Sequence, residues 1–166
     1  MILRASGYTL GLLLLACTGR VEGPPPPSGS GFSRPIFRAI SLDPYDSVAL
    51  GRPLPATVPA TRLSDTLLQL NPGVFSGAVT IAVHTTQAGR VTSLDFDYAP
   101  GTSFEKMVAE YTELFGAPAA GGLIGESGPH WRYWDDDRTR FEIVRRGGGS
   151  RELVQSRLID IAAVEP

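Results

Sequence analysis

Two neighbouring stretches of alternating apolar and polar residues constrain the fold of this chain more than any other feature. They cover residues 78–86 and 91–98, and the turn-forming segment Gln87-Ala-Gly-Arg90 separates them. Successive side chains of a strand point to opposite faces of a sheet, so this alternation predicts an antiparallel hairpin. The pairing that makes one face apolar sets Val83 opposite Leu94, Ile81 opposite Phe96 and Val79 opposite Tyr98. A shift by one residue would expose this apolar face, so the register is well specified.

The polar face of the same hairpin carries the first candidate site. It pairs His84 with Ser93, Ala82 with Asp95 and Thr80 with Asp97. His84 then lies diagonal to Asp95, within hydrogen-bond reach. A histidine–carboxylate pair is a component of general acid–base catalysis, but a solvated cross-strand contact is the commoner arrangement. We therefore expect no catalytic residue and keep His84 and Asp95 as a weak candidate site.

The clearest helix follows this hairpin. Thr102 and Glu105 form a Thr-x-x-Glu capping box, and Gly116 and Pro118 end the helix. Its apolar stripe consists of Phe104, Met107, Val108, Tyr111, Leu114 and Phe115. Such a stripe indicates packing against a core, so we expect no cofactor to bind there.

Two shorter helices are predicted before the hairpin. Asp43-Pro44 has the pattern of an N-cap followed by proline at the first helical position, and Gly51-Arg-Pro53 is a stop signal, which together predict a helix over residues 44–50. Thr61 precedes a second predicted helix over residues 62–70. Its apolar face consists of Leu63, Leu67 and Leu70.

Strands predominate in the remainder of the sequence. Residues 130–134 and 139–144 predict a hairpin, and residues 153–162 a final strand. A three-residue loop would set Tyr133 opposite Phe141 and Trp131 opposite Ile143, with all four side chains buried. The order of elements predicts an α+β domain, in which two or three helices pack on one face of an antiparallel sheet of about five strands.

Residues 117–129 are predicted to form a long loop, and loops of this length are often functional or disordered. Leu123 and Ile124 at its centre contact a partner or pack back onto the domain.

No motif in the sequence identifies a reaction. The acidic run Asp135–Asp137 has ligands that suit calcium or magnesium, but Arg140 and Arg146 stand where an EF-hand requires glycine and glutamate. Aspartate is favoured in tight turns, so we expect a turn and no metal. Pro129 replaces the last glycine of a nucleophile elbow, and no phosphate or dinucleotide fingerprint is present, so we expect no cofactor.

The N-terminal residues have the layout of a secretory signal peptide. Arg4 supplies positive charge, residues 8–16 form a largely apolar stretch, and the small Ala16 precedes Cys17, the only cysteine of the chain. A membrane-spanning helix needs about 18 or more consecutive apolar residues. An uncleaved membrane anchor is therefore the weaker interpretation.

The segment Leu14-Leu15-Ala16-Cys17 resembles the lipobox of bacterial lipoproteins. The resemblance implies signal cleavage between Ala16 and Cys17, a diacylglyceryl group on the cysteine sulfur, and a further acyl chain such as palmitate on the new amino group. Two or more acyl chains hold a protein stably on a membrane. Thr18 stands where aspartate commonly favours inner-membrane retention, so the resemblance implies the outer membrane, facing the periplasm or the cell surface.

These patterns divide the chain into three parts. Residues 1–16 are predicted to be the signal peptide, residues 17–35 the lipidated cysteine with a tether rich in proline, glycine and serine, and residues 36–166 a single α+β domain. Consecutive prolines stiffen such a tether and Ser-Gly repeats loosen it. The tether holds the domain off the membrane, or its prolines dock into an aromatic groove of a partner.

The segments "ALGRP" at Ala49–Pro53 and "LFGAP" at Leu114–Pro118 share a helix-stop pattern, and the first of them resembles the helix ends of small bacterial envelope lipoproteins of the SmpA/OmlA type. The similarity is short, and the long helix between the strands departs from that family's pattern. No functional residue is carried over from it.

The charge of the chain argues against nucleic acid as a partner. Without residues 1–16, 14 basic and 17 acidic side chains remain, and the basic ones do not cluster. We expect the membrane, through lipid on Cys17, and an envelope protein as partners. The leading hypothesis is a non-catalytic protein-binding or structural module of the cell envelope. The alternatives are an envelope hydrolase that uses the polar strand face, and a small-ligand carrier with an apolar cavity between helix and sheet.

Overall fold

The computed structural model describes residues 34–42, 46–71, 75, 77–123, 130–147 and 152–164. All of them lie in the compact unit that residues 31–166 form. The predicted signal peptide and nearly all of the predicted tether, with Ala16 and Cys17, lie outside the described residues.

The described part of the chain is mostly β structure. Its elements are β1 (Ala39–Ile40), β2 (Val48–Ala49), β3 (Ala60–Arg62), β4 (Leu67–Leu70), β5 (Ala78–Thr85), β6 (Val91–Tyr98), α1 (Phe104–Phe115), β7 (Ala120–Leu123), β8 (His130–Asp135), β9 (Thr139–Arg146), β10 (Leu153–Asp160) and α2 (Ile161–Val164).

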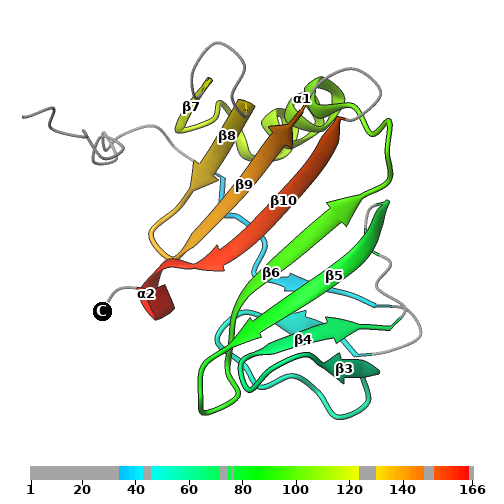
Figure 1. Cartoon of the computed structure of the whole chain (residues 1–166). Helices are drawn as coiled ribbons and strands as arrows, with labels where there is room; N and C mark the ends of the chain where they lie inside the picture. Colours follow the sequence, from blue (N-terminus) through cyan, green and yellow to red (C-terminus); the bar gives the residue numbers. More distant parts are fainter. Residues whose placement is uncertain are drawn as a thin grey trace, which may run out of the picture. The chain divides into compact units, whose positions relative to one another are not determined.

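Eight of these strands form one antiparallel sheet in the order β3-β4-β5-β6-β10-β9-β8-β7, and β1 pairs with β2 in a separate sheet (Figure 1). The large sheet consists of two meanders, β3 to β6 and β7 to β10, which join where β6 pairs with β10. The prediction of about five strands with two or three helices is therefore wrong. The described residues hold α1 and the four-residue α2 as their only helices, because segments predicted as helix or loop form strands instead.

Strands β5 and β6 confirm the predicted central hairpin. Its central pairs are Ile81 with Phe96 and Val83 with Leu94. The predicted pairing of Val79 with Tyr98 is wrong, because a register shift brings Ala78 opposite Tyr98. Val79 is the extra residue of this β-bulge, and 59% of it is exposed.

Residues 62–70 form the end of β3, a turn and β4 rather than the predicted helix. Leucine spacing alone is compatible with a helical face, but Leu68 pairs with Val83 of β5, and Leu63 is 54% exposed in the turn. Thr61 lies in β3 and pairs with Gln69. Backbone pairing of β4 with strands on both sides outweighs a weak helical preference.

The predicted helix over residues 44–50 is also wrong where it is described. Val48 and Ala49 form β2, which pairs with β1, while residues 43–45 lie outside the described residues. Val48 and Ile40 are buried in the main core. The extended backbone of a β-branched valine thus places its side chain beneath the large sheet.

The predicted loop 117–129 is wrong at residues 120–123, which form β7 against β8; Ile124 lies outside the described residues.

The hairpin of β8 and β9 exists, but its register differs by one residue from the predicted one. Trp134, not Tyr133, pairs with Phe141. The Asp136 Oδ1 atom accepts hydrogen bonds from the backbone N–H groups of Arg138 and Thr139, at 2.9 and 2.7 Å. This aspartate turn shortens the loop, so that Tyr133 points away from the core face on which Phe141 lies.

Helix α1 confirms the predicted helix and its end at Gly116, which has φ of 92°. The N-cap is Ser103, whose hydroxyl accepts a hydrogen bond from the Lys106 backbone N–H, so the predicted cap at Thr102 is displaced by one residue. Leu114 of the predicted stripe is 55% exposed. The buried stripe consists of Phe104, Met107, Tyr111 and Phe115.

Helix α1 and the N-terminal segment with β1 and β2 cover the same face of the large sheet (Figure 1). The ring centroids of Tyr111 and Phe141 are 4.3 Å apart, so close contacts fill the space between α1 and β9. Phe37 packs against Phe75, Phe115 and Phe141, with centroid distances of 5.7 to 6.1 Å. The opposite face of the sheet carries partly exposed side chains, and we call it the open face.

Two contacts tie β6 to β10, one on each face of the sheet. On the core face, the Tyr98 hydroxyl lies 2.9 Å from Ser156 Oγ, and burial raises the pKa of Tyr98 well above its usual value. On the open face, Arg157 pairs with Asp95. The junction of the two meanders is thus fixed by side chains as well as by backbone hydrogen bonds.

Candidate functional site

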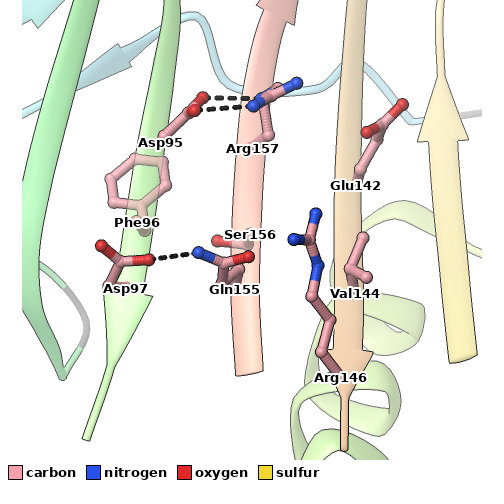
Figure 2. Close-up of a pocket in the computed structure, with 9 residues that line it drawn as sticks. All are labelled: Asp95, Phe96, Asp97, Glu142, Val144, Arg146, Gln155, Ser156 and Arg157. Carbon is pink, nitrogen blue, oxygen red and sulfur yellow. Dashed lines mark hydrogen bonds and ion pairs between the residues drawn. The ribbon is translucent and has the colours of Figure 1, made fainter. Parts of the chain in front are cut away.

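The open face of β6, β10 and β9 carries polar side chains in register (Figure 2). Because alternate residues of a strand share a face, Asp95 and Asp97 of β6 lie beside Arg157 and Gln155 of β10. Arg157 is also the register partner of Glu142 on β9. The guanidinium of Arg157 therefore lies between two carboxylates.

Arg157 binds one of these carboxylates in a bidentate manner. Its Nε and Nη2 atoms donate to Asp95 Oδ1 and Oδ2, both at 2.7 Å. The hydrogen bonds to Asp95 raise the pKa of Arg157. Beside this pair, Gln155 Nε2 donates to Asp97 Oδ1 at 2.6 Å. The floor of the site is thus held in place by paired groups.

A hollow of about 110 Å³ lies over these strands. It is lined by Asp95, Phe96, Asp97, Glu142, Val144, Arg146, Gln155, Ser156 and Arg157 (Figure 2). Pockets for small molecules usually measure roughly 300–1,000 Å³. The hollow therefore fits the end of one side chain better than a cofactor.

Glu142 is a partly buried acid at the β9 side of this hollow. Burial raises the pKa of Glu142, and the nearby Arg140 and Arg157 counteract this effect. Among the described side chains, none donates a hydrogen bond to its carboxylate, since Arg157 directs two N–H groups to Asp95. Arg146 extends along the hollow with no ion pair drawn to it (Figure 2). A partly desolvated carboxylate without a donor is a ready acceptor for an incoming donor group.

An aromatic stack borders the site on β8. The rings of Trp131 and Tyr133 are nearly parallel, with centroids 5.7 Å apart, and Arg140 lies 4.4 Å above the Tyr133 ring. Arg140 in turn binds Asp135 at 3.2 Å. These contacts bury Tyr133 on a face where no described helix covers it.

The two residues of the predicted candidate site do lie together. His84 Nε2 is 3.2 Å from Asp95 Oδ2, as the hairpin register predicts. The side chain of His84 is 40% exposed and lies outside the lining of the hollow, and Asp95 is already bound by Arg157. The pair therefore has the surroundings of a solvated cross-strand contact.

The sequence patterns did not predict Glu142, Arg157 or the aromatic stack as part of a site. A signal was available only in part, because residues 140–143 alternate polar with apolar side chains, whereas residues 153–160 do not. The alternation does not reveal, however, that β10 inserts between β6 and β9.

A second hollow, of about 410 Å³, lies elsewhere, between residues 53–60 and the ends of β4 and β5. Its lining is mostly small and apolar, including Pro53, Leu54, Ala56 and Val58, with Arg62 and Asp65 at one side. It carries fewer convergent polar groups than the hollow on the open face.

No group of acids, histidines or cysteines in the described residues is arranged to hold a metal ion. Asp135 and Asp136 serve the ion pair with Arg140 and the hairpin turn. None of the helices described is both long and apolar enough to cross a membrane. Comparison with protein-family models, curated proteins and solved structures gave no match to this chain.

Proposed function

We propose that this chain is a lipid-anchored protein of the bacterial envelope whose domain binds a partner protein, without catalysis, through the hollow on the open face. The observation that carries the binding role is the carboxylate of Glu142, which is partly buried and accepts no hydrogen bond from the described side chains. A lysine, amide or hydroxyl of a partner would supply that donor, and Arg157 and Gln155 stay fixed by their own pairs.

The anchor rests on the sequence. Ala16 and Cys17 end an apolar leader in the manner of a lipobox, and Thr18 favours the outer membrane over inner-membrane retention. In this proposal, acyl chains on Cys17 hold the protein at the membrane, and the segment up to residue 35 tethers the domain.

A binding role is better supported than hydrolysis or ligand transport. A hydrolase would need His84 and Asp95 to line a pocket beside a nucleophile. The carboxylate of Asp95 is instead bound by Arg157, and the imidazole of His84 is partly exposed to solvent. A small-ligand carrier would need free volume between α1 and the sheet, where Tyr111 and Phe141 are in close contact.

A photo-crosslinking amino acid in place of Arg146 tests the binding surface. Arg146 is exposed and lines the hollow, so its replacement leaves the fold intact. The matched control carries the same amino acid in place of Lys106, whose side chain is 78% exposed on α1. We expect irradiated envelopes to give one reproducible crosslinked partner from position 146 alone. Equal products from both positions, or no product from position 146, would contradict the proposed surface.

Labelling with a fatty acid tests the anchor separately. Wild-type chain should incorporate the label and sediment with the outer membrane, whereas Cys17→Ala should do neither, since the acceptor sulfur is missing. Label and membrane association that persist in Cys17→Ala would refute lipidation at this residue.

A further inference from the structure

The two edge strands of the large sheet differ in how well they are protected. β3 has three residues, all exposed, and ends at the charged Arg62. β7, at the other edge, consists of Ala120, Gly121, Gly122 and Leu123 and carries no charge or proline. No described strand pairs with the outer side of β7. Charges, proline and short length are the usual means of blocking an edge, and β7 has only the last of them.

The two glycines of β7 let side chains of β8 cross over its backbone. A Cβ atom on Gly121 would collide with Arg132 Cδ, and one on Gly122 would lie 3.3 Å from Trp131 Cζ2. Arg132 and Trp131 are the register partners of these glycines and lie on opposite faces of the sheet. Each therefore extends toward the edge, a guanidinium on the face that α1 covers and an indole on the open face.

These two side chains differ in chemistry, and both are partly exposed. Arg132 Nη1 donates to the Trp131 carbonyl at 2.7 Å, and none of the described carboxylates lies within ion-pair distance of it. Trp131 is partly exposed, with one ring face against Tyr133. A strand added at β7 would meet a cation on one face and an apolar ring on the other.

We infer that β7 accepts an extended segment of a partner protein as an added antiparallel or parallel strand, in which acidic side chains face Arg132 and apolar side chains face Trp131. Backbone hydrogen bonds to β7 supply affinity, and the alternation of the segment supplies specificity. The inference concerns the sheet edge and requires neither the lipid anchor nor the hollow at Glu142.

A second copy of the chain fits this edge less well. Two β7 strands paired antiparallel, about a twofold axis perpendicular to the sheet, would present the same faces side by side, and both Arg132 guanidinium groups would then lie on one face. Like charges in that position oppose pairing. An acidic segment has the complementary charge.

Fluorescence anisotropy with the full chain in detergent tests the inference. The probes are two labelled peptides of about eight residues, one alternating valine with aspartate and one alternating valine with lysine. We expect the aspartate peptide to bind wild type at least about tenfold more tightly, and Arg132→Glu to reverse this preference. N-methylation of alternate peptide amides should abolish binding of either probe, because those amides can no longer pair with β7.

Glu142→Gln is the matched control, since it changes the hollow and leaves the edge unaltered. It should bind both peptides as wild type does, and so separates this inference from the proposed function. Equal affinity for the two peptides, an unchanged preference in a folded Arg132→Glu variant, or binding that survives N-methylation would overturn the inference. So would a dimer in light scattering that Arg132→Glu disrupts, since that result assigns the edge to a second copy.

Discussion

Two carboxylates on the open face differ sharply in their surroundings. Asp95 accepts two hydrogen bonds from Arg157 and lies beside His84. Glu142, on the other side of the same arginine, has none from the described side chains, and burial raises its pKa. An ionised Glu142 therefore costs free energy on folding, and a bound donor group would lower that cost.

Glu142→Gln should be more stable than wild type at neutral pH. A raised pKa means that the folded chain binds the Glu142 proton more tightly than the unfolded chain, so stability falls as pH rises from the ordinary value of 4.5 through the raised pKa. Glutamine resembles the protonated acid and has no such loss. Urea unfolding at pH 7 should show a higher free energy of unfolding for Glu142→Gln.

The gain from Glu142→Gln should disappear at a pH well below 4.5, where glutamate is protonated in both states. Glu113→Gln, at an exposed position of α1, is the control and should change little at either pH. A Glu142→Gln variant that is less stable than wild type at pH 7 would show that the ionised carboxylate of Glu142 does not destabilise the fold.

The contact of His84 with Asp95 could be predicted because both residues lie in one hairpin whose alternation defines the register. The contact of Asp95 with Arg157 could not, since it joins residues 62 positions apart on strands whose neighbourhood no local pattern specifies. Side-chain contacts within one hairpin can thus be predicted from the sequence, whereas contacts across the junction of the two meanders cannot.

Among helices and strands, the predictions from sequence are wrong where a local pattern is compatible with two structures. Leu63, Leu67 and Leu70 fit a helical face, yet Ser64 and Asp65 are equally good turn residues, and β4 completes hydrogen bonding on both sides. In the stretch Trp131-Arg-Tyr-Trp134, aromatic residues fall on both faces of the strand. Alternation therefore favours neither register of β8 against β9, and the turn at Asp136 determines which one forms.

The position of the N-cap of α1 can be tested directly. Ser103→Ala should lower the free energy of unfolding by about 1 kcal/mol, because the Lys106 N–H loses its acceptor. Thr102→Ala, at the position that the sequence pattern favours, should have a clearly smaller effect. Chemical denaturation of both variants distinguishes the two caps, and a larger loss for Thr102→Ala would place the cap at residue 102.

The whole domain is held together by contacts that span the two meanders. Phe37, from the N-terminal segment, contacts Phe75 near the start of β5, Phe115 at the end of α1 and Phe141 of β9. Phe75 in turn packs on Phe96 of β6, with ring centroids 5.6 Å apart. One ring thus couples both halves of the sheet.

Phe37→Ala should therefore destabilise the domain as one cooperative unit, by about 3 kcal/mol. Amide hydrogen exchange should show lower protection in β5 and β6 and in β8 and β9 to the same extent. Leu114→Ala, at an apolar residue that is 55% exposed, is the control and should change stability by no more than about 0.5 kcal/mol. Loss of protection confined to one meander would show that the halves unfold independently.

The pairing of β6 with β10 also bears on how the chain reaches its native state. Because a sheet of high contact order folds slowly, we expect strands so distant in sequence to pair late in folding. Until β10 arrives, β6 is an unpaired edge of the first meander, and such edges invite aggregation. Asp95 and Asp97 place two like charges along that edge, which oppose its pairing with another copy. The aspartates that bind Arg157 and Gln155 in the native state thus also oppose aggregation before the sheet is complete.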